Sequence, residues 1–375
     1  MELTTVWFIL IAVLWTGYLV LEGFDFGVGM LLGILPRGKG AERDKERRVL
    51  INTIGPVWDG NEVWLLTAGG ATFAAFPEWY ATLFSGFYLP LLLILLALIV
   101  RVVAFEWRGK IDDPVWRGWA DRALIVGSWV PSVLWGVAFA NIVRGVELDA
   151  AHQYVGGFWA LLNPFALLGG ATTALLFLTH GAVFLALKSD GDVRARAGSL
   201  AARLAPVTLV VAGAWAVWAQ LAYSGKGWTW AAVAVAALAL VLLVVATRQR
   251  REGLAFVASA VTLVAAVVLI FGSLFPDVMP ALDPANSLTV DNASSTHYTL
   301  TVMTWVAVVL TPLVLLYQGW TYWVFRKRIS VEHIPESIGL TFSPAAVVET
   351  GITSRGTGDG PDERTQQHAD DEPSR

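Results

Sequence analysis

The chain has 375 residues, of which 56% are hydrophobic and only 15% are charged, and its formal net charge at pH 7 is −4. A typical soluble domain has about a quarter charged residues, so this composition does not fit one. The sequence contains no cysteine, which excludes disulfides, iron–sulfur clusters, thiolate haem ligation and cysteine-based zinc sites.

Apolar residues fall in continuous blocks long enough to cross a bilayer, which takes roughly 20 residues of helix. Because these blocks are rich in Leu, Ala and Val and do not alternate with polar residues, they predict helices and not a β-barrel. We therefore expect an all-α polytopic membrane protein with nine spans. The predicted spans are roughly 5–35, 50–76, 80–105, 122–144, 158–187, 204–223, 228–247, 254–275 and 299–325.

The basic residues predict the orientation, since Lys and Arg collect on the cytoplasmic side of a membrane protein. With nine spans, all basic residues except Arg101, Arg144 and Lys226 fall on one side. This places the N-terminus outside and the C-terminus in the cytoplasm. Residues 1–335 would form the transmembrane domain and 336–375 a cytoplasmic tail, disordered from about 349 because it is polar and lacks large apolar side chains.

Two acidic pairs lie within the first two spans. Glu22 and Asp25 are three residues apart, as are Asp59 and Glu62, so each pair shares a helix face. A charge at the membrane centre costs about 2.5–3.5 kcal/mol on insertion scales and usually faces the protein interior. At about 1.5 Å per residue, Asp25 and Asp59 would both lie roughly 14–15 Å from the cytoplasmic edge. The four carboxylates would then form a ladder suited to relaying protons, although Asp59 bonded to Asn61 or to a neighbouring helix could instead only lock packing.

Basic and acidic groups in the third span could support this ladder. Arg101 lies near the inner end of the span, and Glu106 follows five residues later. Two interpretations of Arg101 stay open: its side chain reaches the membrane surface, or it pairs with Asp25 or Asp59.

The chain shows no persuasive haem or metal site. A membrane haem needs axial ligands, usually His or Met. Of the five histidines only His180 lies within or near the inner end of a span, and no methionine pairs with it by spacing. We therefore expect no cofactor bound by this chain alone.

Two runs resemble the signature of subunit II of cytochrome bd quinol oxidases: Glu22–Gly29 (EGFDFGVG) and Gly55–Leu65 (GPVWDGNEVWL). The resemblance covers about residues 5–335. Further matches are Thr67–Gly70, Phe84–Tyr88, Arg101 to Arg108, Leu162–Phe165, Leu274–Pro276, Ser294-Ser295 and Val302–Val306.

The resemblance implies a haem-free subunit of a terminal oxidase in the bacterial cytoplasmic membrane, where the complex oxidises quinol and reduces dioxygen to water. Haem b and haem d would be held by the partner, subunit I. This chain would not be catalytic alone, but would shield subunit I and supply proton and oxygen routes. The resemblance leaves open a structural quinone and small accessory subunits, and it implies membrane lipids but no nucleic acid as partners.

The resemblance also assigns roles to single residues. Asp59 matches the acid proposed to begin or sustain the proton path, Trp64 a residue lining the oxygen route, and Trp58 a position near a structural quinone in some members. Glu22 stands where some relatives have Asp, whereas Glu62 stands where some have Gln. From the carboxylates alone, a proton-coupled secondary transporter is the alternative, although no repeated pair of interrupted helices supports it.

Overall fold

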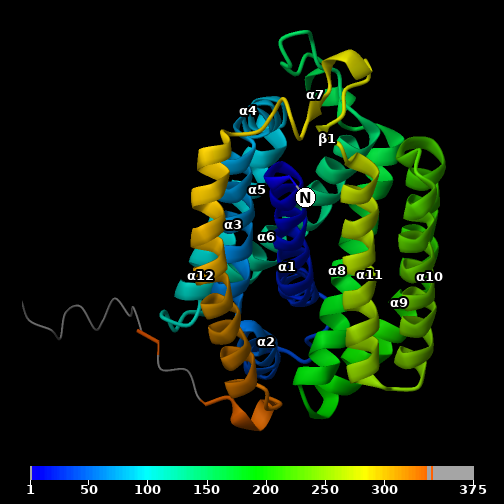
Figure 1. Cartoon of the computed structure of the whole chain (residues 1–375). Coiled ribbons are helices and arrows are strands. Elements are labelled where there is room, and N and C mark those ends of the chain that lie inside the picture. Colours follow the sequence, from blue (N-terminus) through cyan, green and yellow to red (C-terminus); the bar gives the residue numbers. More distant parts are fainter. Residues whose placement is uncertain (1, 336–338, 341–375) are drawn as a thin grey trace, which may run out of the picture.

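The computed structural model describes residues 2–335 and 339–340, and within them the chain is a bundle of long helices (Figure 1). The expected all-α membrane fold is confirmed, and eight of the described helical segments are long and apolar enough to cross a membrane. They are α1 (Leu3–Leu31), α5 (Tyr88–Trp107), α6 (Pro114–Arg144), α8 (Pro164–Lys188), α9 (Gly191–Ala219) continued by η1 (Gln220–Ser224), η2 (Gly227–Thr229) with α10 (Trp230–Arg248), α11 (Glu252–Leu274) and α12 (His297–Val324). The predicted tail 336–375 lies outside the described residues, apart from 339 and 340.

The predicted second span is broken into two helices, α2 (Gly40–Ile54) and α3 (Trp58–Ala75). Pro56 lies in the break, as expected of a residue that cannot donate a helical hydrogen bond. The predicted depth of Asp59 assumed one continuous helix from Leu50, and that assumption is wrong. Asp59 instead lies in the first turn of α3, where a helix favours negative charge. With 18 residues, α3 is about 27 Å long, slightly less than the roughly 30 Å hydrocarbon core, and it is not among the eight spanning segments. The number of nine crossings and the orientation of the chain therefore stay predictions.

Helix α1 lies at the centre of the bundle, in contact with α3, α6, α8 and α11 (Figure 1). Glycines bring α1 and α8 together. A Cβ atom on Gly27 would lie 2.0 Å from the carbonyl oxygen of Phe177 and 2.8 Å from Gly181, and one on Gly23 would lie 2.8 Å from the Phe177 ring. The backbones of α1 and α8 can therefore touch only because Gly27 and Gly181, where the helices cross, have no side chains.

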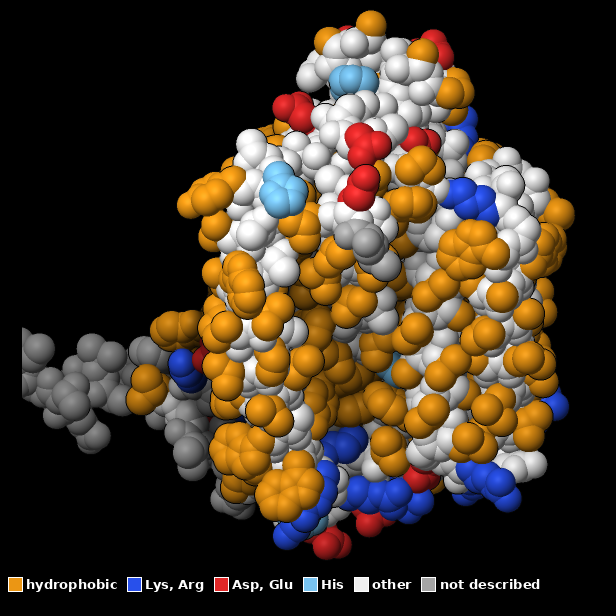
Figure 2. Space-filling model, viewed as in Figure 1, with side chains coloured by type: hydrophobic (Ala, Val, Ile, Leu, Met, Phe, Trp, Pro, Cys, Tyr) orange, Lys and Arg blue, Asp and Glu red, His pale blue; other side chains and the backbone are white. Residues whose placement is uncertain are grey.

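The end of the bundle at the top of Figure 1 is closed by short elements. They comprise α4 (Pro77–Gly86), α7 (Gly157–Ala160), η3 (Pro284–Asn286) and the antiparallel strands β1 (Asp277–Met279) and β2 (Leu288–Thr289). The opposite end, which also carries η4 (Val331–His333), displays Lys and Arg side chains (Figure 2).

A network of ion pairs ties the basic end together. Arg108 donates to Asp121 at 2.6 Å and to Asp44 at 2.7 Å, and Arg47 donates to Asp121 at 2.8 Å. Burial disfavours the charge of Arg108, but its bonds to Asp121 and Asp44 raise its pKa above the ordinary value. The network anchors α2 to α6 and to the end of α5.

Candidate functional site

A buried ion pair joins α1 to α5. The Nη1 atom of Arg101 donates to Oε1 of Glu22 at 2.5 Å, and both side chains are 0% exposed. The neighbouring helix α6 makes room, because a Cβ atom on Gly127 would lie 2.6 Å from the Cβ of Arg101. Arg101 therefore neither reaches the surface nor pairs with Asp25 or Asp59.

Asn61 on α3 connects Asp25 to α12. Its Nδ2 atom donates to Asp25 Oδ2 at 2.6 Å, and its Oδ1 accepts from Tyr322 at 2.7 Å and from Gln318 at 3.1 Å. The sequence analysis missed Gln318 and Tyr322. Their signal was a pair of polar residues four apart near the end of an apolar span.

Aromatic rings enclose the Arg101 guanidinium. Its Cζ atom lies 4.7 Å from the ring centroid of Phe26 and 5.1 Å from that of Phe105. The Trp58 ring stacks on the Phe105 ring, with the two centroids 5.3 Å apart and an interplanar angle of 5°. Such rings stabilise a desolvated cation. Trp58 is thus linked to the charge cluster through Phe105.

The structure does not bring all predicted acids into one ladder. Glu62 is half-buried on α3 and interacts electrostatically with Arg101. Asp59 is exposed and makes no hydrogen bond or ion pair with the described residues, so it is not locked by Asn61. Glu106 is also exposed and lies 3.9 Å from Lys110, away from the cluster.

Trp64 on α3 contacts both α1 and α12. A Cβ atom on Gly17 would lie only 2.1 Å from the Trp64 ring, so the absence of a side chain there admits the indole. Its Nε1 donates to Gln318 at 2.8 Å. The next two residues, Leu65 and Leu66, line an apolar groove of about 510 Å³ between α3, α4, α5 and α6.

The cluster has unused polar capacity. Glu22 Oε2, Asp25 Oδ1, and Arg101 Nε and Nη2 are buried and have no hydrogen-bond partner among the described residues. The two fully buried carboxylates face a single guanidinium, so one added proton would make this trio neutral. Within the described part of the chain, no three or more His, Cys, Asp and Glu side chains gather as a metal site would require. The arrangement is suited to holding and passing protons.

The fold and this interior charge cluster define a polytopic membrane protein with buried, ion-paired carboxylates. The family model for cytochrome bd terminal oxidase subunit II matches residues 3–325, so the chain belongs to that family. This confirms the resemblance seen in the motifs of the first two spans.

Individual relatives agree. The chain is 44% identical over 339 residues to cytochrome bd ubiquinol oxidase subunit 2 of Bacillus subtilis (strain 168), covering 88% of this chain and 97% of the relative. It is 39% identical over 368 residues to cytochrome bd-I ubiquinol oxidase subunit 2 of Escherichia coli (strain K12), covering 88% and 96%. A chain in the structure of bd oxidase from Geobacillus thermodenitrificans matches with a TM-score of 0.71 at 19% identity, covering 87% of this chain and 100% of that one, which supports the fold.

Proposed function

We propose that this chain is the haem-free subunit II of a bd-type terminal oxidase in the bacterial cytoplasmic membrane. The complex would oxidise quinol and reduce dioxygen to water, with haem b and haem d held by subunit I. Family membership and the names of the relatives support this over the transporter alternative. His180 fits a haem-free chain, since its two ring nitrogens already bond to Ser259 at 2.7 Å and to the Val20 carbonyl at 3.1 Å.

The observation that carries the role of this chain is the buried trio of Glu22, Asp25 and Arg101. Asn61 holds one oxygen of Asp25 and leaves the other free to take a proton. Burying an uncompensated charge costs several kcal/mol, so charge balance favours uptake of a proton by the trio. Half-buried Glu62 would pass protons between exposed Asp59 and this trio.

The exposed position of Asp59 supports a partner contact at this face. A carboxylate that faces lipid is costly, so a protein surface is the better cover. Next to α3, helix α12 has only Leu300 buried and carries exposed aromatic and aliphatic side chains along its length (Figure 2). We therefore assign the α3–α12 face to contact with subunit I. Small accessory subunits would bind elsewhere.

Trp64 and Trp58 would serve the two apolar reactants. Dioxygen partitions into apolar space, and Trp64 directly precedes two leucines that line the 510 Å³ groove. Trp58 offers an indole beside the charge cluster at which a structural quinone ring could stack. Both roles follow the family pattern.

The proton role is tested by Asp59→Asn, with Glu106→Gln as the matched control. Both replace an exposed carboxylate with a neutral amide of similar shape. We expect Asp59→Asn to lower quinol-driven oxygen consumption and proton uptake by about tenfold or more, because a positioned proton donor is lost. Glu106→Gln should leave both near normal. Near-normal turnover of Asp59→Asn, with full haem content in the assembled complex, would contradict the role.

The docking face is tested by introducing single cysteines. Because the natural sequence has no cysteine, each introduced thiol would be the only one in this chain. Val63 on α3 and Val257 on α11 are 46% and 56% exposed. A photo-crosslinker on Val63→Cys should capture subunit I, whereas one on Val257→Cys should not. Equal capture from both positions would show that the face is wrongly assigned.

A further inference from the structure

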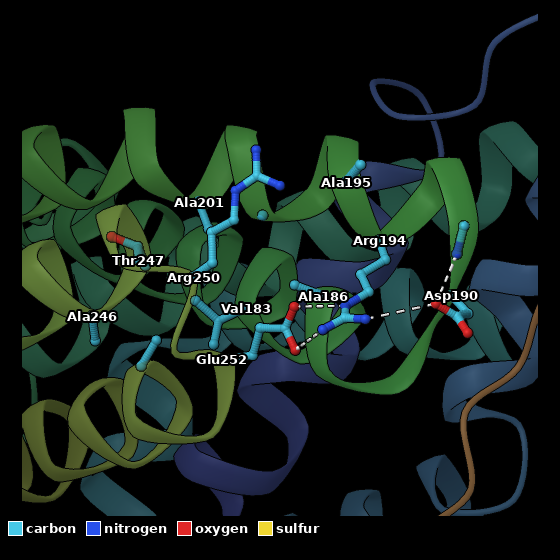
Figure 3. Close-up of a pocket in the computed structure, with 13 residues that line it drawn as sticks. Val183, Ala186, Asp190, Arg194, Ala195, Ala201, Ala246, Thr247, Arg250 and Glu252 are labelled. Carbon is cyan, nitrogen blue, oxygen red and sulfur yellow. Dashed lines mark hydrogen bonds and ion pairs between the residues drawn. The ribbon is translucent and has the colours of Figure 1, made fainter.

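A second cavity lies at the basic end of the bundle, where α8, α9, α10 and α11 meet (Figure 3). Its volume is about 350 Å³, within the range of small-molecule pockets. Charged side chains form its rim, and small residues form its floor. The rim comprises Asp190, Arg194, Arg250 and Glu252, and the floor includes Ala186, Gly198, Ala201, Ala246 and Ala255.

One arginine of the rim, Arg250, has no side-chain partner among the residues that the structure describes. Glu252 accepts from Arg194 at 2.7 and 3.0 Å and from Arg328 at 2.8 Å, so two guanidiniums already compensate it. Asp190 is farther from Arg194, at 3.7 Å. Among the residues that the structure describes, Arg250 makes no ion pair, and Figure 3 shows its guanidinium pointing away from the Arg194–Glu252 pair. Arg250 is therefore available for an anion.

The backbone at Arg250 does not require an arginine. Its φ is 57°, in the left-handed region, and it follows the last turn of α10. Its N–H donates to the carbonyl of Thr247, and the N–H of Arg251 donates to that of Ala246, which is the hydrogen-bond pattern of a Schellman cap. Glycine is the usual residue at this position. The arginine side chain is thus an addition to the turn, which glycine would form with less strain.

We propose that this cavity binds the phosphate group of an anionic phospholipid, with Arg250 as its main contact. A guanidinium matches phosphate geometry, and basic pockets between helices at the cytoplasmic side suit anionic headgroups. The floor argues for a lipid over free phosphate. It extends from Gly191, next to the rim residue Asp190, to Ala201, about 15 Å along α9, and so continues from charged to apolar surroundings. This site is separate from the proton cluster and does not depend on its role.

Arg250→Gly is the decisive variant, because it removes the side chain while keeping the backbone conformation that glycine prefers. Arg248→Gln, which removes an exposed charge from the end of α10 outside the cavity, is the control. The purified oxidase complex is mixed with phosphatidylglycerol or phosphatidylcholine, and bound lipid is counted by native mass spectrometry. We expect wild type to retain phosphatidylglycerol preferentially, Arg250→Gly to lose about tenfold in its retention, and Arg248→Gln to change it less than about twofold.

A second variant tests the floor. A Cβ atom on Gly198 would meet only the Cβ of Ala186, at 3.9 Å, so Gly198→Leu should fill the cavity and also displace phosphatidylglycerol. Inorganic phosphate is added in parallel and should not compete. Equal retention of the two lipids, equal losses in Arg250→Gly and Arg248→Gln, or displacement of the lipid by inorganic phosphate would each overturn the proposal.

Discussion

The side-chain amide of Asn61 holds the buried carboxylate of Asp25 at 2.6 Å. The other end of the same amide accepts hydrogen bonds from Tyr322 and Gln318. One residue on α3 therefore fixes the position of a carboxylate on α1 relative to α12. A movement of α12 would therefore shift Asn61 and alter its hydrogen bond to Asp25.

Asn61→Leu should weaken both the fold and the activity. Leucine has a similar size but leaves the buried Asp25 and the half-buried Gln318 and Tyr322 without these partners. An unsatisfied buried group costs about 1–3 kcal/mol. We expect a lower Tm of the complex in scanning fluorimetry, together with slower oxygen consumption. Thr67→Val is the control, since the Thr67 hydroxyl bonds only to Val63 within its own helix. An Asn61→Leu complex with unchanged Tm and turnover would contradict the assigned role.

The pairing of Arg101 with Glu22 predicts a rescue. Arg101→Leu leaves Glu22 buried without its counter-charge, which should destabilise the complex by about 3–5 kcal/mol and lower its yield. The double variant Glu22→Gln/Arg101→Leu should regain much of that stability, while oxygen consumption stays low because the proton site is gone. Thermal unfolding of the two variants and of Glu22→Gln forms a double-mutant cycle. Purely additive effects on stability would argue against the pair.

At the basic end, Asp121→Asn should destabilise the complex more than loss of a surface ion pair. Arg108 is buried and depends on Asp121, and removing one partner of a buried pair costs about 3–5 kcal/mol. Glu106→Gln breaks only the exposed pair with Lys110 and should change stability by less than about 1 kcal/mol. The comparison of the two Tm values checks this, and similar values would count against a structural network.

Gly17→Ala should displace the Trp64 ring, because the added methyl group would lie 2.1 Å from it. We expect loss of the bond between Trp64 and Gln318, and destabilisation by about 1–3 kcal/mol from overpacking. Gly17→Ala/Trp64→Leu should be less destabilised than the sum of the two single changes. Gly213→Ala, with open space around the added atom, is the control and should be neutral or stabilising. Tm measurements of the four variants would refute the contact if Gly17→Ala behaved like Gly213→Ala.

Sequence patterns predicted the class of fold and the acids of the first two spans, because charge within an apolar block is a local signal. They could not predict that Arg101 pairs with Glu22, 79 residues away, since that choice depends on how α1 and α5 rotate against each other. They also treated 50–76 as continuous. The break at Pro56 restarts the helix, which changes the direction of the following side chains and leaves Asp59 outside while Asn61 points inward.

The contacts of Asn61 also impose an order on biosynthesis. Translation proceeds from the N-terminus, so Asn61 emerges from the ribosome well before Gln318, which lies 257 residues later in the chain. Until α12 is inserted, the oxygen of Asn61 lacks both Gln318 and Tyr322. Arrival of the last span therefore completes the environment of Asp25. A nascent chain that stops short of α12 would leave the Asn61 oxygen without these two donors.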